Sequence, residues 1–272
     1  MTAVAEATPV AVEATAPTDA RIRVQRAEGL GVVTLARPAK KNALDRRTAD
    51  ELHAALRELA ADPAVRVVVL EGEGDDFCAG ADLEALDGML DAPPDVHIAD
   101  ARALGRVFAQ LRGLPKPSVA VVRGRALAGG AGLATACDIV LAEERAVFGY
   151  PEVRIGFVPA MVMTMLRRAV GEKRAAELVL TARLIDAAEA ERIGLVSRCI
   201  PSARFAEEVG ATLERLVAAP AVALELTKRL LYRLDDLDFA AGIAAGITTN
   251  VESRATEEFK AGVRKFVAKD RA

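Results

Sequence analysis

The chain has 272 residues, a length that allows one or two folded domains with a sizeable core. Slightly over half of its residues are apolar, so the whole chain cannot be disordered. The formal net charge of −3 gives no general attraction to nucleic acid or to anionic lipid, and neither partner is expected.

The three cysteines, Cys78, Cys137 and Cys199, show no CxxC or Cys/His ligand spacing. The sequence therefore predicts neither a disulfide framework nor a zinc site, and no metal is expected. Unpaired cysteines are typical of a reducing compartment, so we expect a cytoplasmic protein.

Residues 1–19 are rich in Ala, Thr, Val and Pro and contain no basic residue. A secretory signal needs a charged start and a mitochondrial transit peptide needs arginines, so this segment is predicted to be a mobile tail. No apolar run in the chain approaches the ~20 residues needed to cross a bilayer. We expect a soluble protein without a membrane partner.

Strands and helices are predicted to alternate in the first part of the chain. Arg21–Ala27 and Leu30–Ala36 have alternating patterns around a Glu-Gly turn and predict a hairpin. Asp45 can cap a helix over Arg46–Ala61. The other elements predicted here are a strand at Arg66–Glu71, a short helix from Asp82, a helix over Val96–Leu111, and strands at Ser118–Val122 and Ile139–Ala142.

From Met161 onward the apolar spacing favours helices, interrupted by one strand at Leu195–Ile200. No strand is expected after Pro201. We therefore divide the chain into a tail (1–19), a mixed core (20–201) and a helical region (202–272). The predicted helices span Met161–Val170, Lys173–Thr181, Ala187–Arg192, Ala203–Ala218, Pro220–Leu234 and Glu252–Lys269.

Two glycine-rich segments, Phe77–Leu83 and Ala126–Leu133, share a layout in which a strand ends, small residues follow and a helix begins. Small residues let a ligand approach the backbone, and a helix N-terminus leaves N–H groups free. Two such groups converging on one oxygen would form an oxyanion hole. The alternative is that the glycines serve only tight turns and close packing. A dinucleotide site is disfavoured because the G-x-G-x-x-G pattern is not matched.

With these segments, the sequence resembles the enoyl-CoA hydratase/isomerase (crotonase) family from about Arg21 to Lys269. The order and spacing of the matching motifs carry the resemblance. These motifs are Arg37–Leu44, Phe77–Leu83, Gly124–Asp138, Phe148–Val153, Val170-Gly171, Leu180–Ile185 and Ala190–Val196.

The resemblance implies an α/β fold, a ββα superhelix (spiral) core with a C-terminal helical region that forms a homotrimer or a homohexamer. It also implies an acyl-CoA thioester as substrate, so that coenzyme A is part of the substrate and no separate cofactor is expected. The backbone N–H groups of Ala81 and Gly129 would form the oxyanion hole. Ala43 and Ala79 would line the groove for the CoA group. Further substrate contacts are implied for Gly80, Asp82, Leu83, Gly130, Pro151, Phe266 and Lys269.

Glu152 is the catalytic residue that the resemblance implies, beside the reacting carbons of the substrate. A carboxylate in an apolar pocket has a raised pKa, which suits proton exchange with a weak carbon acid. Considered without the family, a lone glutamate after a proline would be read as a surface residue.

One position departs from the family. Hydratases of the family usually carry a second glutamate where this chain has Gly132. Water addition is helped by two carboxylates, whereas a double-bond shift needs a single base. The sequence therefore favours an isomerase. The alternatives are a hydratase working with one glutamate, an enzyme of C–C bond chemistry, and a non-catalytic acyl-CoA-binding protein. Acyl chain length and pathway are not predicted.

A few other polar residues and a cysteine lie in or near these segments. Asp82, Glu84 and His97 could supply a missing acid, but a structural or solvent-facing place is favoured for each. Asp138 is interpreted as a hydrogen-bonding anchor, and Cys78 as a small packing residue, since no histidine is paired with it.

Overall fold

The computed structural model describes residues 19–269, without the side chain of Lys269. Most of the predicted tail therefore lies outside the described residues. Its last residue, Asp19, is described, and its carboxylate pairs with Arg47 at 2.9 Å. Within the described range no helix is both long and apolar enough to cross a membrane.

A six-stranded sheet forms the centre of the fold, in the order β1-β2-β3-β4-β6-β9. β1 pairs with β2 in the antiparallel sense, and each later neighbour pairs in parallel. The predicted hairpin is confirmed, as is the strand at Ser118–Val122. The strands span Ile22–Ala27 (β1), Leu30–Leu35 (β2), Val67–Gly72 (β3), Ser118–Val122 (β4), Ile139–Glu143 (β6) and Arg198–Ile200 (β9).

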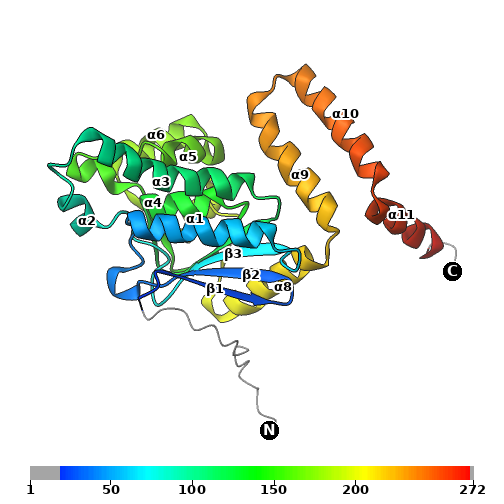
Figure 1. Ribbon diagram of the computed structural model, residues 1–272, viewed down its shortest axis with the longest axis horizontal. Coiled ribbons are helices and arrows are strands. Elements are labelled where there is room, and N and C mark those ends of the chain that lie inside the picture. The colour runs from blue at the N-terminus through cyan, green and yellow to red at the C-terminus, as the bar shows by residue number, and fades with distance from the viewer. Residues whose placement is uncertain (1–18, 270–272) are drawn as a thin grey trace, which may run out of the picture.

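Helices cover both faces of this sheet. Val68 and Leu70 of β3 belong to the larger apolar core, which includes leucines of α1 and α3, and Figure 1 shows α1, α3 and α4 stacked on one side of the strands. Val67 and Val69 point the other way and pack with Phe205 of α8. A strand buried on both faces reads as a continuous apolar run, as this one does. The covering helices span Arg46–Ala61 (α1), Pro94–Gly113 (α3), Gly129–Ala136 (α4) and Phe205–Ala218 (α8).

A second sheet of three strands, in the order β5-β7-β8, was not predicted. Its strands are Arg125–Leu127 (β5), Val147–Gly149 (β7) and Leu184–Asp186 (β8). Three residues are too few to show an alternating pattern, so only tertiary pairing reveals these strands.

The C-terminal part is helical, and among the described residues no strand follows β9, as predicted. Figure 1 shows α9, α10 and α11 extending as an arm away from the sheet. The remaining α-helices span Leu83–Asp87 (α2), Val162–Val170 (α5), Glu172–Thr181 (α6), Ala187–Arg192 (α7), Ala221–Arg233 (α9), Phe239–Ala255 (α10) and Glu257–Lys269 (α11), and the 3-10 helices span Pro38–Lys40 (η1), Pro151–Ile155 (η2), Ser202–Arg204 (η3) and Leu234–Asp236 (η4).

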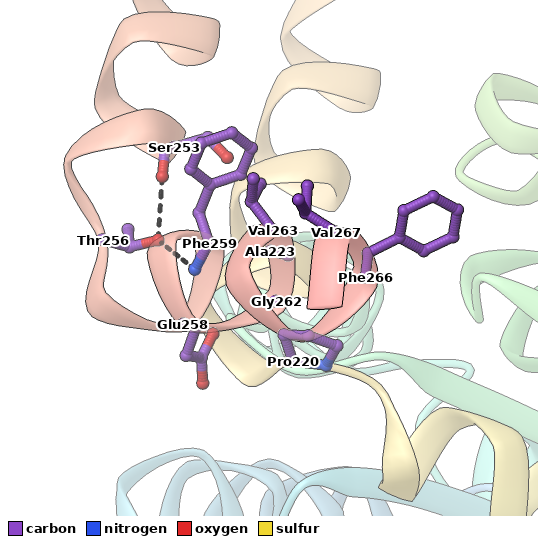
Figure 2. Close-up of a pocket in the computed structure, with 10 residues that line it drawn as sticks. All are labelled: Pro220, Ala223, Ser253, Thr256, Glu258, Phe259, Gly262, Val263, Phe266 and Val267. Carbon is purple, nitrogen blue, oxygen red and sulfur yellow. Dashed lines mark hydrogen bonds between the residues drawn. The ribbon is translucent and has the colours of Figure 1, made fainter. Parts of the chain in front are cut away.

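The single helix predicted over Glu252–Lys269 is wrong. Thr256 has an extended backbone and ends α10, and its hydroxyl accepts the N–H of Phe259 at 3.2 Å, which caps α11 (Figure 2). The start of α10 was missed because Gly242 and Gly246 lower its intrinsic helix preference. Packing of α10 against α9 provides the stabilisation that this segment lacks by itself.

Candidate functional site

Three loops gather at one edge of the main sheet. They follow β2, β3 and β4, which are neighbours and run in parallel, so their carboxyl ends lie side by side. Ligand sites in such sheets form outside these ends. The three loops contain the Arg37–Leu44 motif and the two glycine-rich segments, and the tertiary structure therefore brings together three motifs that are far apart in the sequence.

Ala81 is held in a parallel bridge with Leu44. The Leu44 N–H donates to the Gly80 carbonyl at 2.7 Å, and the Asp82 N–H donates to the Leu44 carbonyl at 2.8 Å. Neighbouring peptide groups of an extended chain point to opposite edges, so the Ala81 N–H points away from Leu44. In the described part of the chain this N–H has no protein acceptor.

Gly129 is the first residue of α4, where backbone N–H groups have no partner within the helix. Its amide nitrogen would lie 3.6 Å from a Cβ placed on Gly80, the residue before Ala81. The two candidate donors thus come from segments in direct contact. The residue before the helix, Ala128, has a positive φ of 50°, a conformation that L-residues rarely adopt and that is typical of functional turns.

The glycines of both segments have a packing role as well. A Cβ on Gly80 would lie 2.8 Å from the Cβ of Ala128, and one on Gly130 would lie 2.2 Å from the carbonyl oxygen of Cys78. Close packing and ligand approach are therefore not alternatives here. The tight contact between the segments is what brings the Gly129 amide next to Gly80, the residue before Ala81.

Glu152 lies in η2 and is 8% exposed. Its chain segment is tied to both ends of α4, because the Ala128 N–H before the helix donates to the Gly149 carbonyl at 2.8 Å and the Tyr150 hydroxyl lies 3.2 Å from that of Thr135 in the last turn. The Oε2 atom of Glu152 is buried and has no hydrogen-bond partner among the described residues. Burial raises the pKa of this carboxyl above its ordinary value.

The space beside Gly132 is closed. A Cβ at this position would lie 2.4 Å from Cγ1 of Val162 and 3.0 Å from the Phe108 ring. A side chain at this position would require the Val162 and Phe108 side chains to shift. Among the described residues, the site therefore has one buried carboxylate with an unpartnered oxygen, that of Glu152, and apolar side chains stand where a second acid would have to enter.

The structure places the other predicted contact residues as follows. Ala43 is buried, and Ala79 is half-buried with its N–H on the Lys41 carbonyl. Leu83, the first residue of α2, is 60% exposed. Pro151 begins η2 immediately before the catalytic candidate. All four lie on the loops at the sheet edge or directly beside them.

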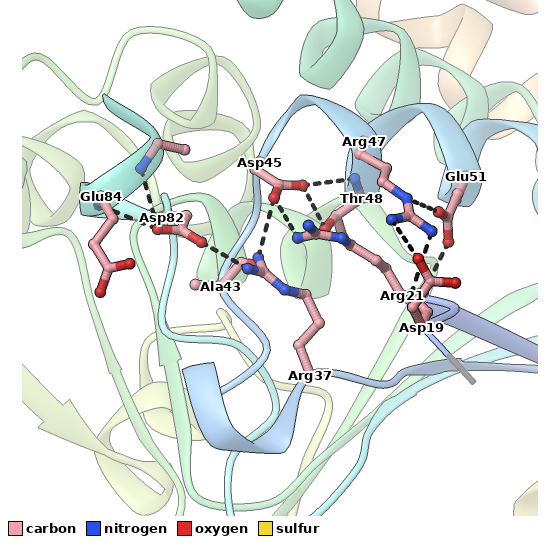
Figure 3. Close-up of polar contacts among 11 residues, drawn as sticks. Asp19, Arg21, Arg37, Ala43, Asp45, Arg47, Thr48, Glu51, Asp82 and Glu84 are labelled. Carbon is pink, nitrogen blue, oxygen red and sulfur yellow. Dashed lines mark hydrogen bonds and ion pairs between the residues drawn. The ribbon is translucent and has the colours of Figure 1, made fainter. Parts of the chain in front are cut away.

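Asp82 is not free to contact a ligand through its carboxylate. One oxygen accepts from Arg37 at 2.7 Å, and the other accepts the amides of Glu84 and Ala85, which caps α2 (Figure 3). The interpretation of Asp82 as a structural residue agrees with these contacts. Sequence reasoning gave no role to Arg37, although it stands in a matching motif.

Phe266 lies far from these loops within one chain. Figure 1 shows α11 at the end of the arm, opposite α2. Phe266 is 70% exposed and lines an apolar groove of about 370 Å³ between α9 and α11 (Figure 2). Lys269 ends α11, and its side chain lies outside the described residues.

Two further interpretations agree with the structure. The Asp138 carboxylate accepts the Ser118 N–H at 2.6 Å and the Tyr232 hydroxyl at 2.6 Å, and it pairs with the buried Lys228 at 2.8 Å. It is an anchor between the core and α9. Cys78 is fully buried, and burial raises the pKa of its thiol to about 12, so it packs and does not react.

The sequence matches the family model for enoyl-CoA hydratase/isomerase over residues 25–272. A Thermus thermophilus protein named "Putative enoyl-CoA hydratase" is 43% identical over 240 residues, which covers 88% of this chain and 95% of that protein. The short-chain-enoyl-CoA hydratase of Clostridium acetobutylicum is 34% identical, with 88% and 92% covered.

Solved structures agree with the sequence comparison. The crystal structure of an enoyl-CoA hydratase from Mycobacterium smegmatis superposes with a TM-score of 0.88 at 30% identity, and it covers 92% of this chain and 97% of the other.

Proposed function

The chain belongs to the enoyl-CoA hydratase/isomerase family of enzymes, and from this premise we propose that it moves a double bond within an enoyl-CoA thioester. The observation that carries the proposal is the pair Gly132 and Val162. Water addition is helped by two carboxylates, and the place of the second one is filled by apolar side chains. One buried carboxylate suits a reaction in which the same group takes a proton and returns it.

In the proposed reaction the thioester carbonyl of a 3-enoyl-CoA accepts hydrogen bonds from the N–H groups of Ala81 and Gly129. Glu152 removes a proton from C2, and the electron pair moves into the carbonyl to give a dienolate. Each preorganised donor of this kind stabilises such an oxyanion by about 3 kcal/mol. Glu152 then returns the proton to C4, which leaves the double bond between C2 and C3. No atom is gained or lost.

The proposed reaction needs no group besides the coenzyme A carried by the substrate. Ala43, Ala79 and the neighbouring loop backbone would line the groove for that group. Cys78, Cys137 and Cys199 are all free thiols, which fits a reducing compartment, and we place the enzyme in the cytoplasm.

Apolar side chains near the site are candidates for the acyl chain. Leu83 and Leu90 on the α2 side, and Phe157 and Val158 after η2, are each at least half exposed. Exposed apolar groups gathered near a site are typical of a ligand or partner surface. We propose that these side chains line the binding site of an apolar acyl chain.

A homotrimer or homohexamer is proposed from the C-terminal arm. Phe239, Ile243, Ile247 and Val251 recur at every fourth position of α10 and are 54–87% exposed. In aqueous solution such an apolar stripe is stabilised when another surface shields it from water. A second copy of the arm offers a matching apolar surface. Phe266 and Lys269 would then serve the CoA groove of a neighbouring copy. Sedimentation should give three or six times the 28.7 kDa chain mass, and a monomer would contradict the proposal.

Hydration is the second candidate function, because the named relatives quoted above are hydratases. The deciding experiment gives the protein a 3-enoyl-CoA and, separately, a 2-enoyl-CoA. We expect the ultraviolet absorbance of the conjugated enoyl thioester to appear with the first substrate and to stay nearly constant with the second. If the protein instead consumes the absorbance of 2-enoyl-CoA faster than it produces that absorbance from 3-enoyl-CoA, and the product is heavier by one water molecule, the protein is a hydratase. No change with either would favour a non-catalytic acyl-CoA-binding protein.

A variant extends the same experiment. Gly132→Glu alone should destabilise the fold by about 1–3 kcal/mol, because its Cβ meets Val162. Combined with Val162→Ala, the glutamate gains room, and hydration of 2-enoyl-CoA should rise about 100-fold, the low end of what an added acid/base group contributes. Val162→Ala by itself is the control. A folded double variant without increased hydration would contradict the link between Gly132 and the reaction type.

A further inference from the structure

Arg37 lies at the junction of the loops that form the site (Figure 3). Its side chain is 14% exposed. One guanidinium nitrogen donates to the Ala43 carbonyl at 2.5 Å and lies 3.5 Å from the Asp45 carboxylate. A second nitrogen donates to the Asp82 carboxylate at 2.7 Å. The guanidinium is therefore engaged by protein acceptors on two different loops.

These contacts hold both sides of the bridge that orients Ala81. Ala43 directly precedes Leu44 on one side, and Asp82 directly follows Ala81 on the other. The Asp82 N–H donates to Leu44, and the Asp82 carboxylate caps α2. One planar group thus fixes the residues next to the bridge on each loop, and its fork geometry suits this two-sided contact.

The two aspartates near Arg37, Asp45 and Asp82, differ in whether they have a second cationic partner. Asp45 also pairs with Arg21 and caps α1, so it keeps a cation when Arg37 is removed. Asp82 is 8% exposed in its side chain, and Arg37 is its cationic partner among the described residues. Burial opposes the ionisation of Asp82, but the hydrogen bonds from Arg37 and the α2 amides outweigh it, and the pKa of this carboxyl lies below its ordinary value. Loss of Arg37 would leave this buried charge with the α2 amides but without a cationic partner.

We propose that Arg37 is a positioning residue, and that its ion pair with Asp82 aims the Ala81 N–H at the substrate's developing oxyanion. The inference rests on the proposed function, in which Ala81 is one of the two donors. Arg37 does not touch the substrate. Its effect is therefore greater on the charged transition state than on the binding of a neutral thioester.

The test compares Arg37→Met with Arg47→Met. Arg47 belongs to the neighbouring ion-pair network on α1, is about half exposed, and contacts neither loop of the bridge (Figure 3). We expect Arg37→Met to lower kcat about 100-fold, the effect of losing one oxyanion donor, with KM changed less than ~3-fold. Arg47→Met should keep both parameters. Arg37→Lys should recover part of kcat, since an ammonium can reach one of the two acceptors.

A binding experiment separates positioning from a general structural role. Acetoacetyl-CoA forms an enolate that resembles the intermediate, whereas the thioester group of butyryl-CoA stays uncharged. Arg37→Met should weaken acetoacetyl-CoA binding about as much as it lowers kcat and should leave butyryl-CoA binding nearly unchanged. Equal losses for both ligands, or no loss for either, would overturn the proposal.

Asp82→Asn provides a second variant if Arg37→Met does not fold. It keeps an oxygen for capping α2 and removes the charge that Arg37 binds. The same selective loss of acetoacetyl-CoA binding is expected, and the double variant should be no worse than Arg37→Met, because both residues act through one pair. This comparison also distinguishes the two proposals. If the wild-type protein shifts no double bond, the proposed function fails, while the ratio of the two binding constants still tests Arg37.

Discussion

Replacing Glu152 by Gln should lower kcat for the double-bond shift by about 1,000-fold, within the range that a positioned general base contributes. The amide has nearly the same shape as the carboxyl group but cannot accept the C2 proton. Butyryl-CoA binding should remain close to that of the wild type, because the Ala81 and Gly129 amides are untouched. Steady-state kinetics with a 3-enoyl-CoA and calorimetric titration with butyryl-CoA make the comparison. Turnover at the wild-type rate would remove Glu152 from the mechanism.

The same residue makes the activity depend on pH in a definite direction. Burial raises the pKa of the Glu152 carboxyl, and the base must be ionised to act. The wild-type kcat should therefore fall as the pH drops through this raised pKa. Stability changes in the opposite sense, since the folded state holds the proton more tightly than the unfolded chain. That contribution is complete below the unfolded-state pKa and is lost as the pH rises through the folded-state pKa. Glu152→Gln should thus be at least as stable as the wild type at neutral pH.

The second large effect is expected for Gly130→Ala. The added methyl group would lie 2.2 Å from the Cys78 carbonyl oxygen, and a backbone atom cannot rotate away as a side chain can. The two glycine-rich segments must then separate. Overpacking of this kind costs about 1–3 kcal/mol. The loss of alignment between the two amides should lower kcat by at least ~100-fold, the effect of one missing donor.

Gly210→Ala is the matched control for this substitution. Gly210 lies in α8, and nothing is within 4 Å of a Cβ added there. The same chemical change should therefore stabilise the protein by about 0.5–1 kcal/mol, because alanine favours the helix. Urea unfolding measures both variants, and a 3-enoyl-CoA assay measures the activity of each. A Gly130→Ala protein as stable and active as Gly210→Ala would show that the close contact between the segments is not needed.

Several elements could be predicted because their signals are local. The helix Arg46–Ala61 was predicted with the bounds that the structure has, since Asp45 caps it and its leucines recur at helical spacing. The strand Ser118–Val122 is a short, mostly apolar run that directly follows Pro115 and Pro117. By contrast, β5, β7 and β8 carry three residues each and depend on partners far away in the sequence. The start of α10 contains two glycines and depends on α9 for its stability.

The candidate site, too, could be predicted from the sequence only in part. The glycine-rich segments, Glu152 and the unusual Gly132 were recognisable from the sequence, because each belongs to a motif of a known family. Their contacts were not recognisable. That Arg37 joins Ala43 to Asp82, and that Val162 and Phe108 fill the space beside Gly132, are facts about side chains from different loops and helices.

The amino-acid sequence by itself determined the family, the α/β character of the core, the helical C-terminal region and the choice of Glu152 as the candidate base. Residue types, caps and apolar periods are short-range properties, and they are written along the chain. Only the tertiary structure decided that β2, β3 and β4 end side by side, which brings the segments of Ala81 and Gly129 into contact. It also decided that no room is left for a second acid. Both depend on strand order and on packing between distant segments, which no local pattern in the chain encodes.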